Sequence, residues 1–245
     1  MRVDLKVFDA VLFDLDGVLT QTAAVHAAAW KRLFDEYLQA RSSGDDSTFV
    51  PFDIDQDYRR YVDGKLRQDG VKSFLESRGI TLPYGEPQDG PDRETIHGLG
   101  NKKDRYFQAH LKEHGVKVYE DAVRFLRAVR AQGLRTAVVS ASKSTAAVVQ
   151  RIGLTDCFDV RIDGVESARL HLKGKPAPDG FLEAARRLGV EPARAIVVED
   201  AVAGVQAGRN GGFGLVIGID RTGHAEELRE QGAMLVTSNM AELVP

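Results

Sequence analysis

The chain contains very little cysteine, because Cys157 is the only one among its 245 residues. A single thiol excludes internal disulfides and cysteine-rich metal sites, and it is typical of a reducing compartment. Long apolar runs are also missing, since no stretch approaches the roughly 20 residues that a membrane-spanning helix needs. Charged side chains lie within residues 1–9, where a secretory signal peptide would need its apolar region. We therefore expect a cytoplasmic protein with no membrane partner.

An excess of charge of one sign is missing as well. The 33 lysine and arginine residues nearly balance 36 aspartate and glutamate residues, so the net charge is −3, and both kinds are mixed along the chain. Without a basic stripe or an acidic tail, a nucleic-acid partner has no support. The hydrophobic content of 43% is enough to bury a full core, in one large domain or in a domain with an insertion.

Several familiar catalytic signatures are incomplete or missing. The segment Gly98-Leu99-Gly100 lacks the third glycine of a dinucleotide-binding loop. The pair Gly174-Lys175 is followed by proline, not by the serine or threonine of a P-loop. No Gly-x-Ser-x-Gly elbow occurs, and the six histidines do not show zinc-ligand spacing. These gaps argue against the enzyme classes that depend on such motifs.

Short apolar runs alternate with helical patterns from about Val118 to the C-terminus. The helical patterns end at glycines such as Gly133, Gly153 and Gly189, which are natural helix stops. The predicted buried strands are 11–13, 136–139, 195–198, 215–217 and 234–236. Strands joined by single helices imply right-handed crossovers. We therefore predict a doubly wound, Rossmann-like α/β core with a parallel sheet and helices on both faces.

Between Gln21 and Lys117 the hydrophobic pattern of the sequence changes, and no strand-rich stretch is found there. Helical spacing recurs instead, over 25–38, 57–78 and 101–114. An all-helical insertion directly after the first strand would cover the carboxyl end of that strand as a cap. The predicted domains are an α/β core at 1–21 and 117–245 and an α-helical cap domain at 22–116.

The most informative segment is the end of the first apolar run, where two carboxylates, Asp14 and Asp16, precede Gly17. Open α/β sheets place their chemistry at the carboxyl ends of strands. Aspartates at i and i+2 leave a strand on the same side, so they can share a metal ion or a reacting phosphoryl group. One could serve as nucleophile and the other as acid/base. An ordinary strand-to-turn Asp-Gly is the alternative, and the rest of the chain has to decide.

Three further segments carry polar side chains at comparable places. Ser140 follows the second core strand, Lys175 precedes a helix, and Glu199-Asp200 ends a third strand. Each alone has a plainer explanation, as a loop hydroxyl, a surface charge or a helix N-cap pair. In a parallel sheet, however, all of them converge on the edge that carries Asp14. Their joint occurrence in this order favours a catalytic site.

This ordered set resembles the haloacid dehalogenase superfamily over nearly the whole chain. The four matching motifs are 14–19, Ser140, Lys175 and Glu199-Asp200. Asp16 stands where the family's phosphatases and phosphomutases carry an acid, whereas its dehalogenases lack that acid and its P-type ATPases have threonine. The resemblance is greatest to the β-phosphoglucomutase subgroup, whose sequences are nearly the same as this one over 14–23, 140–143 and 174–179.

The chemistry of such a set can be argued from the residues. Phosphomonoesters resist attack because their oxygens repel an anionic nucleophile. We expect Asp14 to form a phosphoaspartate, while Asp16 protonates the leaving sugar oxygen and then deprotonates the next nucleophile. Lys175 and Ser140 would hold the phosphoryl oxygens, and Mg²⁺ suits the oxygen donors. The predicted metal ligands are Asp14, Glu199, Asp200 and the main-chain oxygen of Asp16.

The resemblance also implies substrate contacts. His26 matches a family histidine that helps couple cap closure to the acid/base. The segment 64–67 is similar to the cap segment whose arginine grips the distal phosphate, which suits bidentate contact by Arg67. Lys102 and Lys103 both lie near the family's cap lysine, and Ser144 is a further core-side candidate. The predicted substrate-binding residues are His26, Gly64, Arg67, Lys103, Ala141, Ser142 and Lys143.

The resulting prediction is a monomeric, magnesium-dependent enzyme acting on small sugar phosphates. If a sugar hydroxyl is the second nucleophile, the enzyme is a mutase that converts β-glucose 1-phosphate into glucose 6-phosphate, primed by glucose 1,6-bisphosphate. If water is that nucleophile, it is a sugar-phosphate phosphatase, which is the alternative. A catalytically silent binding module is a third interpretation, but it would be marked by loss of Asp14, Asp16 or Asp200, and none is lost.

Overall fold

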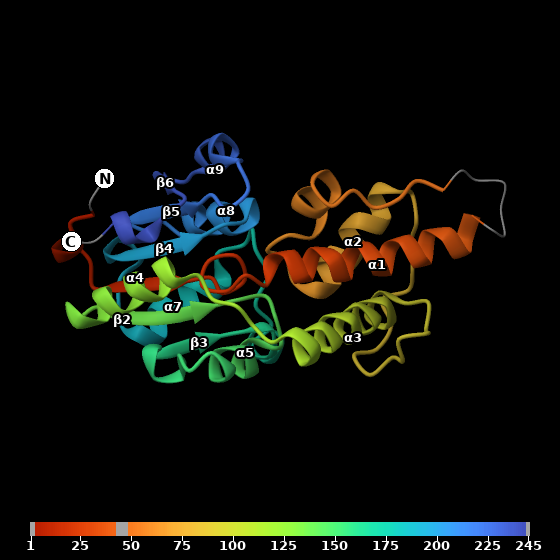
Figure 1. The fold of residues 1–245 in the computed structure, drawn as a ribbon, viewed down its shortest axis with the longest axis horizontal. Coiled ribbons are helices and arrows are strands. Elements are labelled where there is room, and N and C mark those ends of the chain that lie inside the picture. The colour runs from red at the N-terminus through yellow and green to blue at the C-terminus, as the bar shows by residue number, and fades with distance from the viewer. Residues whose placement is uncertain (1–2, 43–48, 244–245) are drawn as a thin grey trace. The chain divides into compact units, whose positions relative to one another are not determined.

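The computed structural model describes residues 3–42 and 49–243. Residues 1–2, 43–48 and 244–245, which the predicted domains include, lie outside the described residues. The chain divides into two compact units (Figure 1). The first, called here the α/β unit, is Met1–Gln21, Gly64–Leu66 and Val116–Pro245, and the second, the helical unit, is Thr22–Asp63 and Arg67–Gly115. Residues 64–66, expected in the cap, therefore group with the α/β unit. None of the described helices is long and apolar enough to cross a membrane.

The α/β unit is built on a six-stranded sheet in the order β3-β2-β1-β4-β5-β6 (Figure 1). All neighbouring strands are parallel, which confirms the predicted doubly wound α/β fold. The strands are β1 Ala10–Phe13, β2 Arg135–Val139, β3 Val160–Ile162, β4 Ala195–Glu199, β5 Leu215–Ile219 and β6 Leu235–Thr237. Because β1 lies between β2 and β4, the strand order reverses there, at the point where such sheets bind ligands.

The helices of this unit are α4 Glu120–Ala131, α5 Thr145–Arg151, α6 Gly164–Arg169, α7 Asp179–Leu188, α8 Val202–Asn210 and α9 Ala225–Gln231. Short 3₁₀ turns cover Leu5–Val7, Thr155–Cys157, Pro192–Arg194 and Met240–Glu242. Along β1, Leu12 packs in one cluster with Phe181 of α7. The next residue, Phe13, meets the ring of Phe125 in α4 edge-on, with centroids 5.9 Å apart. The strand is thus buried on both faces, which explains its unbroken apolar run.

Strand β3 was missed by the sequence analysis. It has only three residues, and its central residue, Arg161, is exposed, so no apolar run marks it. The strand is recognised only through its pairing with β2, in which Val138 lies beside Arg161. Helix α6 follows at once, with the side chain of Asp163 accepting from the main-chain N–H groups of Val165 and Glu166. The pairing of β3 with β2 depends on the tertiary structure, so the local sequence pattern does not predict this strand.

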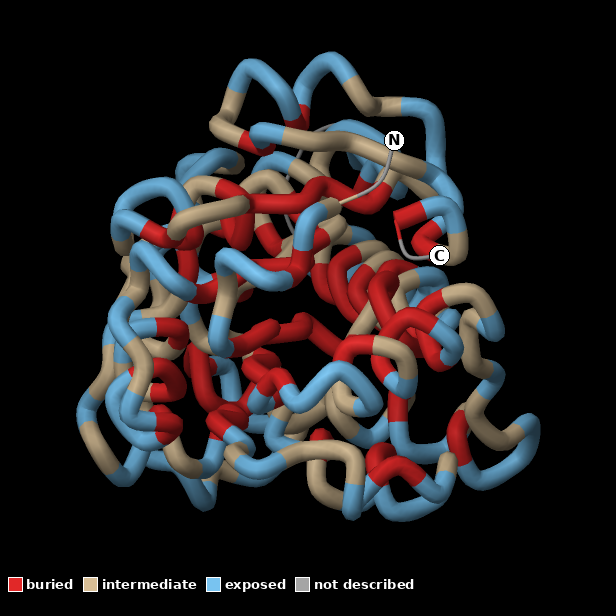
Figure 2. Tube along the Cα trace, turned by 90° about the vertical axis from the view of Figure 1, so that its left-hand side faces the viewer, coloured by how far each residue is buried: buried red, intermediate tan, exposed pale blue. Residues whose placement is uncertain are grey.

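The helical unit contains α1 Ala23–Ser42, a π-helical turn Tyr58–Val62, α2 Arg67–Ser77 and α3 Ile96–His114. Within the described part of 22–116 no strand occurs, in agreement with the expected helical insertion. Its core joins all three α-helices. Phe34 of α1 packs on Phe74 of α2 with ring centroids 4.1 Å apart, and α3 contributes Ile96 and Leu99. Figure 2 colours the buried residues of the described chain red along the Cα trace.

The starts of α3 and α2 differ most from those expected in this unit. Helix α3 begins at Ile96, five residues before the predicted start, because the Thr95 hydroxyl accepts a hydrogen bond from the Gly98 N–H at 3.0 Å. Glycine is a poor helix former, which concealed this first turn. The helical pattern expected over 57–78 is interrupted before α2, where Gly64 adopts φ +69°. That left-handed conformation favours glycine.

Candidate functional site

The predicted catalytic side chains of the α/β unit meet at the carboxyl edge of its sheet. Strand β1 pairs with both neighbours so that Phe13 lies beside Val138 of β2 and Val198 of β4. The residues that follow these three positions therefore emerge at one edge. They are Asp14 and Asp16 after β1, Ser140 after β2, and Glu199 and Asp200 at the end of β4.

Asp14 is almost fully buried, and both of its carboxylate oxygens accept hydrogen bonds. Oδ1 lies 2.5 Å from the Lys175 ammonium, and Oδ2 accepts from the main-chain N–H of Asp16 at 2.8 Å. Burial raises the pKa of Asp14 to about 8 although Lys175 lowers it, and the negative charges of Glu199 and Asp16 raise it further. An attacking carboxylate must be ionised, so Asp14 needs more positive charge close to it than Lys175 alone supplies.

Lys175 lies between two carboxylates, because its ammonium also contacts Glu199. Both side chains are buried, and Glu199 is fully so. Burial alone would lower the pKa of Lys175, but Asp14 and Glu199 raise it, so the ammonium stays charged. The other oxygen of Glu199 accepts the N–H groups of Asp200 and Ala201, each at 3.0 Å. Glu199 thus holds both Lys175 and the main chain at the end of β4.

Asp16 and Ser140 form a second pair at the same edge. The Ser140 hydroxyl donates to Asp16 Oδ2 at 3.2 Å and accepts from the Ser142 N–H at 3.1 Å. The following loop packs closely on the start of α6, since a Cβ built on Gly164 would lie 2.6 Å from the Ala141 carbonyl oxygen. Lys143 of this loop is exposed, and a small cavity of about 20 Å³ opens beside Ser140, Ala141 and Lys175.

Asp200 lies over the turn that follows β1. Gly17 in that turn has φ +97°, and a Cβ built on it would overlap the Asp200 carboxylate. The turn can therefore accommodate Asp200 only because residue 17 has no side chain. A residue that the sequence analysis missed touches the same position: His224 Nε2 lies 3.3 Å from the Asp200 carbonyl oxygen. The only sequence signal there is a turn, Thr222-Gly223, which does not identify the contact.

The donors at this edge suit a hard divalent cation. Among residues 3–42 and 49–243, no three His, Cys, Asp or Glu side chains are grouped as metal ligands. The carboxylate of Glu199, a predicted ligand, is fully buried, and one of its oxygens already accepts from two amides while the other contacts Lys175, which disfavours that role. Each oxygen of Asp14, in contrast, accepts a single hydrogen bond and can take a further partner. The donors that fit are the Asp14 and Asp200 carboxylates and the main-chain oxygen of Asp16. Mg²⁺ commonly binds through one or two carboxylates and keeps several waters, so this sparse set is compatible with it.

In the helical unit, His26 of α1 and Lys103 of α3 are direct neighbours. Lys103 Nζ lies 2.5 Å from His26 Nδ1, and the His26 ring stacks on Phe107 with centroids 3.9 Å apart. Lys103 is only 4% exposed, and its ammonium lies 5.0 Å from the centroids of both Trp30 and Phe107. Lys102, the other candidate, pairs instead with Glu36 at 3.1 Å. Of the two lysines, Lys103 is therefore the one beside His26.

Arg67 begins α2 and lies against α3. Its guanidinium contacts the Gly100 carbonyl at 3.3 Å and the Asp104 carboxylate at 3.2 Å, and its side chain is 13% exposed. The Arg67 side chain packs closely on α3 at Gly100, because a Cβ at that position would lie 3.2 Å from Arg67 Cγ. Gly64 belongs to the α/β unit, where a Cβ built on it would lie 3.0 Å from the Ala201 side chain. The predicted substrate residues are thus divided between the two units.

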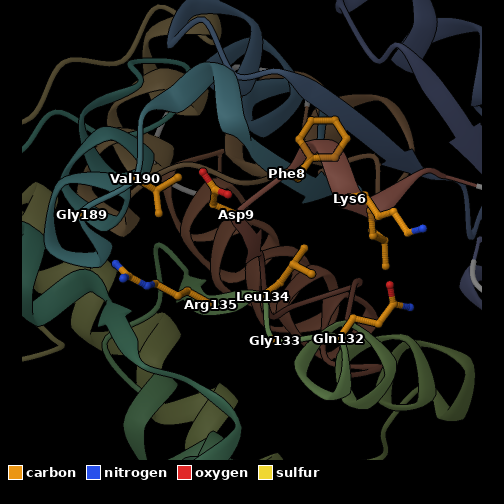
Figure 3. A pocket seen from close by; sticks show the side chains of 10 residues that line it. Lys6, Phe8, Asp9, Gln132, Gly133, Leu134, Arg135, Gly189 and Val190 are labelled. Carbon is orange, nitrogen blue, oxygen red and sulfur yellow. The ribbon is translucent and has the colours of Figure 1, made fainter.

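A separate pocket of about 490 Å³ opens at the other end of the strands (Figure 3). Its labelled charged residues are Lys6, Asp9 and Arg135, which precede or begin β1 and β2. Asp9 is paired with Arg194, and Arg135 contacts the Leu188 carbonyl. None of the predicted site residues lines this pocket.

Known proteins resemble this chain over most of its length. A family model described as haloacid dehalogenase-like hydrolase matches residues 8–212. The β-phosphoglucomutase of Mycobacterium tuberculosis (strain CDC 1551 / Oshkosh) is 50% identical over 238 residues, which is 96% of this chain and 91% of that protein. A phosphorylated carbohydrates phosphatase of Thermotoga maritima is 27% identical over 230 residues, 92% of each chain. The crystal structure of β-phosphoglucomutase from Clostridium difficile superposes with TM-score 0.75 at 26% identity, covering 96% of this chain and 93% of that one.

Proposed function

Because this chain belongs to the haloacid dehalogenase-like hydrolase family and its β-phosphoglucomutase-like subgroup, we propose that it transfers phosphoryl groups on small sugar phosphates. The proposed reaction converts β-glucose 1-phosphate into glucose 6-phosphate through glucose 1,6-bisphosphate. The observation that carries this proposal is the buried contact between Asp14 and Lys175, with Asp16 beside Ser140 at the same sheet edge. It brings a nucleophile, a fixed positive charge and a separate acid/base together.

In the first half-reaction, a carboxylate oxygen of Asp14 attacks phosphorus. The bond from phosphorus to the sugar oxygen breaks, and a phosphoaspartate forms. Lys175 offsets the negative charge of nucleophile and phosphoryl group, and the Ser140 hydroxyl binds a phosphoryl oxygen. Asp16 gives its proton to the departing sugar oxygen. The main-chain hydrogen bond from Asp16 to Asp14 keeps the two residues in register.

In the second half-reaction, Asp16 takes a proton from the incoming hydroxyl, whose oxygen attacks the phosphorus of the phosphoaspartate. The bond from phosphorus to the Asp14 oxygen breaks, and the Asp14 carboxylate is regenerated. A hydroxyl of a sugar phosphate as acceptor gives mutase activity, and water gives phosphatase activity. Both outcomes use the same residues of the α/β unit. A sugar-phosphate phosphatase is therefore the second candidate, and the similarity to the Thermotoga maritima phosphatase favours it.

Mg²⁺ would be held by the carboxylates of Asp14 and Asp200 and the main-chain oxygen of Asp16. When bound, it supplies the positive charge that the buried Asp14 needs in order to stay ionised close to a phosphoryl group. The overlap that any side chain at Gly17 would make with Asp200 supports this assignment, because the turn is shaped to admit a second carboxylate.

The helical unit is proposed to distinguish mutase from phosphatase. Arg67 would bind the phosphate that is not being transferred, since a guanidinium matches phosphate oxygens in bidentate fashion. Its contacts with Gly100 and Asp104 support this role by fixing the guanidinium on α3. His26, with its neighbour Lys103, would help align the acid/base when substrate is bound. Substrate-driven closure of such a unit would exclude water.

The test is phosphorus NMR of the enzyme with Mg²⁺ and β-glucose 1-phosphate, primed with glucose 1,6-bisphosphate. The proposal predicts that glucose 6-phosphate accumulates with little inorganic phosphate. Accumulation of inorganic phosphate would make the enzyme a phosphatase, and the absence of either product would overturn the proposed substrate class.

A further inference from the structure

The loop that follows β5 carries a histidine toward the end of β4. Residues 220–224 form a tight turn in which one oxygen of Asp220 accepts the main-chain N–H groups of Thr222, Gly223 and His224, at 3.1, 2.7 and 3.0 Å. Gly223 takes φ +86° within it. A turn that fixes three successive amides on one carboxylate holds His224 in a defined direction.

The loop is also anchored from outside. The guanidinium of Arg221 donates to the Ser238 carbonyl at 2.6 Å and to the Asp121 carboxylate at 3.0 Å. It lies over the ring of Tyr119, 4.0 Å from the centroid. Three contacts of this kind, all in the α/β unit, make the loop a rigid support for the histidine beside Arg221.

The two ring nitrogens of His224 have complementary partners. Nε2 lies 3.3 Å from the Asp200 carbonyl oxygen, and Nδ1 lies 2.7 Å from the Thr222 hydroxyl. A carbonyl oxygen only accepts, so Nε2 carries a proton. Nδ1 faces the Thr222 hydroxyl and, at 3.5 Å, a carboxylate oxygen of Asp220. The His224 side chain is 10% exposed, and its contact with the Asp200 carbonyl is partly buried, whereas its contact with Thr222 is exposed.

These contacts hold the main chain of Asp200 from both sides. Its N–H donates to Glu199 at 3.0 Å, and its carbonyl accepts from His224. The backbone on either side of the Asp200 Cα is therefore fixed, and so is the direction in which its carboxylate lies over Gly17. Groups that orient a metal ligand in this way typically change metal affinity by 10–100-fold when they are removed.

We infer that His224 is a positioning residue, which fixes the main chain of Asp200 and thereby presents the Asp200 carboxylate to the divalent cation. The inference rests on the proposed function, because it takes Asp200 as a ligand. Glutamine can place a side-chain N–H near the position of Nε2, whereas leucine has a similar volume and no donor.

The experiment is a titration of the metal-free enzyme with Mn²⁺, in which EPR measures the free ion. We expect His224→Leu to bind Mn²⁺ about 10-fold more weakly than the natural chain, and His224→Gln to stay within about 3-fold of it. At saturating Mg²⁺, the KM for sugar phosphate should be unchanged in both variants. Thr222→Val, a change at an exposed residue that removes the hydroxyl partner of Nδ1, should weaken Mn²⁺ binding by about 2-fold to 3-fold and serves as the readout if His224→Leu does not fold.

Asp200→Ala is the control that separates this inference from the proposed function. If Asp200→Ala abolishes Mn²⁺ binding but His224→Leu, or Thr222→Val in its place, binds like the natural chain, the positioning role is overturned and the metal site stands. Equal weakening by glutamine and leucine would also overturn it, because the hydrogen bond would then not matter. If Asp200→Ala binds Mn²⁺ as the natural chain does, the proposed metal site fails and the inference fails with it.

Discussion

Asp14 receives a hydrogen bond on each of its two oxygens, one from a side chain far away in the sequence and one from its own turn. The pair of contacts fixes the carboxylate plane before any substrate arrives. Such preorganisation reduces the reorganisation that the reaction would otherwise require. Asp16, in contrast, is half-buried and bonded to a neutral hydroxyl, that of Ser140. Two aspartates of one turn thus have environments suited to different roles.

The role of Asp16 as acid/base can be tested by the leaving group. Asp16→Asn should slow transfer from sugar phosphates by about 10²–10⁴-fold, because a sugar alkoxide leaves only when it is protonated. The leaving group of an activated aryl phosphate needs little protonation, so the attack of Asp14 on such a substrate should slow much less. Pre-steady-state rates on both kinds of substrate measure the difference. Equal losses on both would remove Asp16 from this role.

The role of Glu199 is structural as well as electrostatic. Glu199→Leu would remove one partner of the buried Lys175 and leave two main-chain N–H groups without their acceptor. Breaking a buried charged contact of this kind costs about 3–5 kcal/mol of unfolding free energy. Urea unfolding followed by circular dichroism measures it.

The matched control is Glu226→Leu. Glu226 pairs with Arg229 at 3.0 Å on the surface and is 77% exposed, so its loss should cost less than about 1 kcal/mol. If Glu199→Leu costs as little as Glu226→Leu, the buried contact with Lys175 does not stabilise the fold.

At this scale, the sequence was sufficient to indicate which residues gather at the sheet edge, because all of them except Lys175, which precedes a helix, lie at the end of a strand's apolar run. It could not show that Glu199 faces Lys175, since that contact depends on how the turn before α7 packs against the end of β4. It also left Lys102 and Lys103 undecided. Only the packing of α1 on α3 distinguishes them, by placing Lys103 among the rings of Trp30 and Phe107.

At the scale of elements, α1 and α3 of the helical unit are joined by a polar network on Glu36. Its carboxylate accepts from Tyr106 at 2.5 Å and Arg32 at 3.0 Å, and pairs with Lys102 at 3.1 Å. Partial burial would raise the pKa of Glu36, but these hydrogen bonds lower it to about 2. The folded state therefore binds fewer protons at this residue than the unfolded chain does between about pH 4.5 and 2.

The resulting stabilisation is present above about pH 4.5 and decreases as the pH falls toward 2. Glu36→Gln should therefore unfold more easily than the natural chain at neutral pH, and the difference should shrink as the pH is lowered below about 4.5. Urea midpoints at a series of pH values measure it. Glu76→Gln, in an exposed pair with Lys72 at 3.8 Å, is the control and should change stability little. A difference for Glu36→Gln that grows on acidification would contradict the assignment.

Element prediction succeeded where the pattern was local and failed where pairing decided. Strands β2 and β4 were expected within one residue of their bounds, because both are continuous apolar runs. Strand β3 has an exposed arginine at its centre and exists through its pairing with β2. Helix α3 gained its first turn from the Thr95 cap, against the low helix propensity of Gly98 and Gly100.

At the scale of the whole molecule, the proposed chemistry lies in the α/β unit and the proposed choice of acceptor lies in the helical unit. This division predicts that a change in the helical unit can separate two activities. Arg67→Ala should reduce mutase turnover strongly, because the second phosphate loses its partner. Hydrolysis of acetyl phosphate should be nearly unaffected, since that substrate has only the phosphate that is transferred.

Steady-state assays of both activities measure this separation, with Arg105→Ala as an exposed arginine control in the same unit. Equal damage to both activities by Arg67→Ala would make the arginine structural. No damage to either would remove the main support for the mutase, and a broad sugar phosphatase would be the better description.

During turnover Asp14 should carry the phosphoryl group. Acid-quenching the enzyme during turnover of β-glucose 1-phosphate and glucose 1,6-bisphosphate, followed by mass spectrometry of its peptides, detects that group. We predict a phosphoryl group on Asp14, which is absent in the inactive but folded Asp14→Asn and retained in the surface control Asp9→Asn. Continued turnover by Asp14→Asn, or turnover of the natural enzyme with no phosphoryl group on Asp14, would contradict the account.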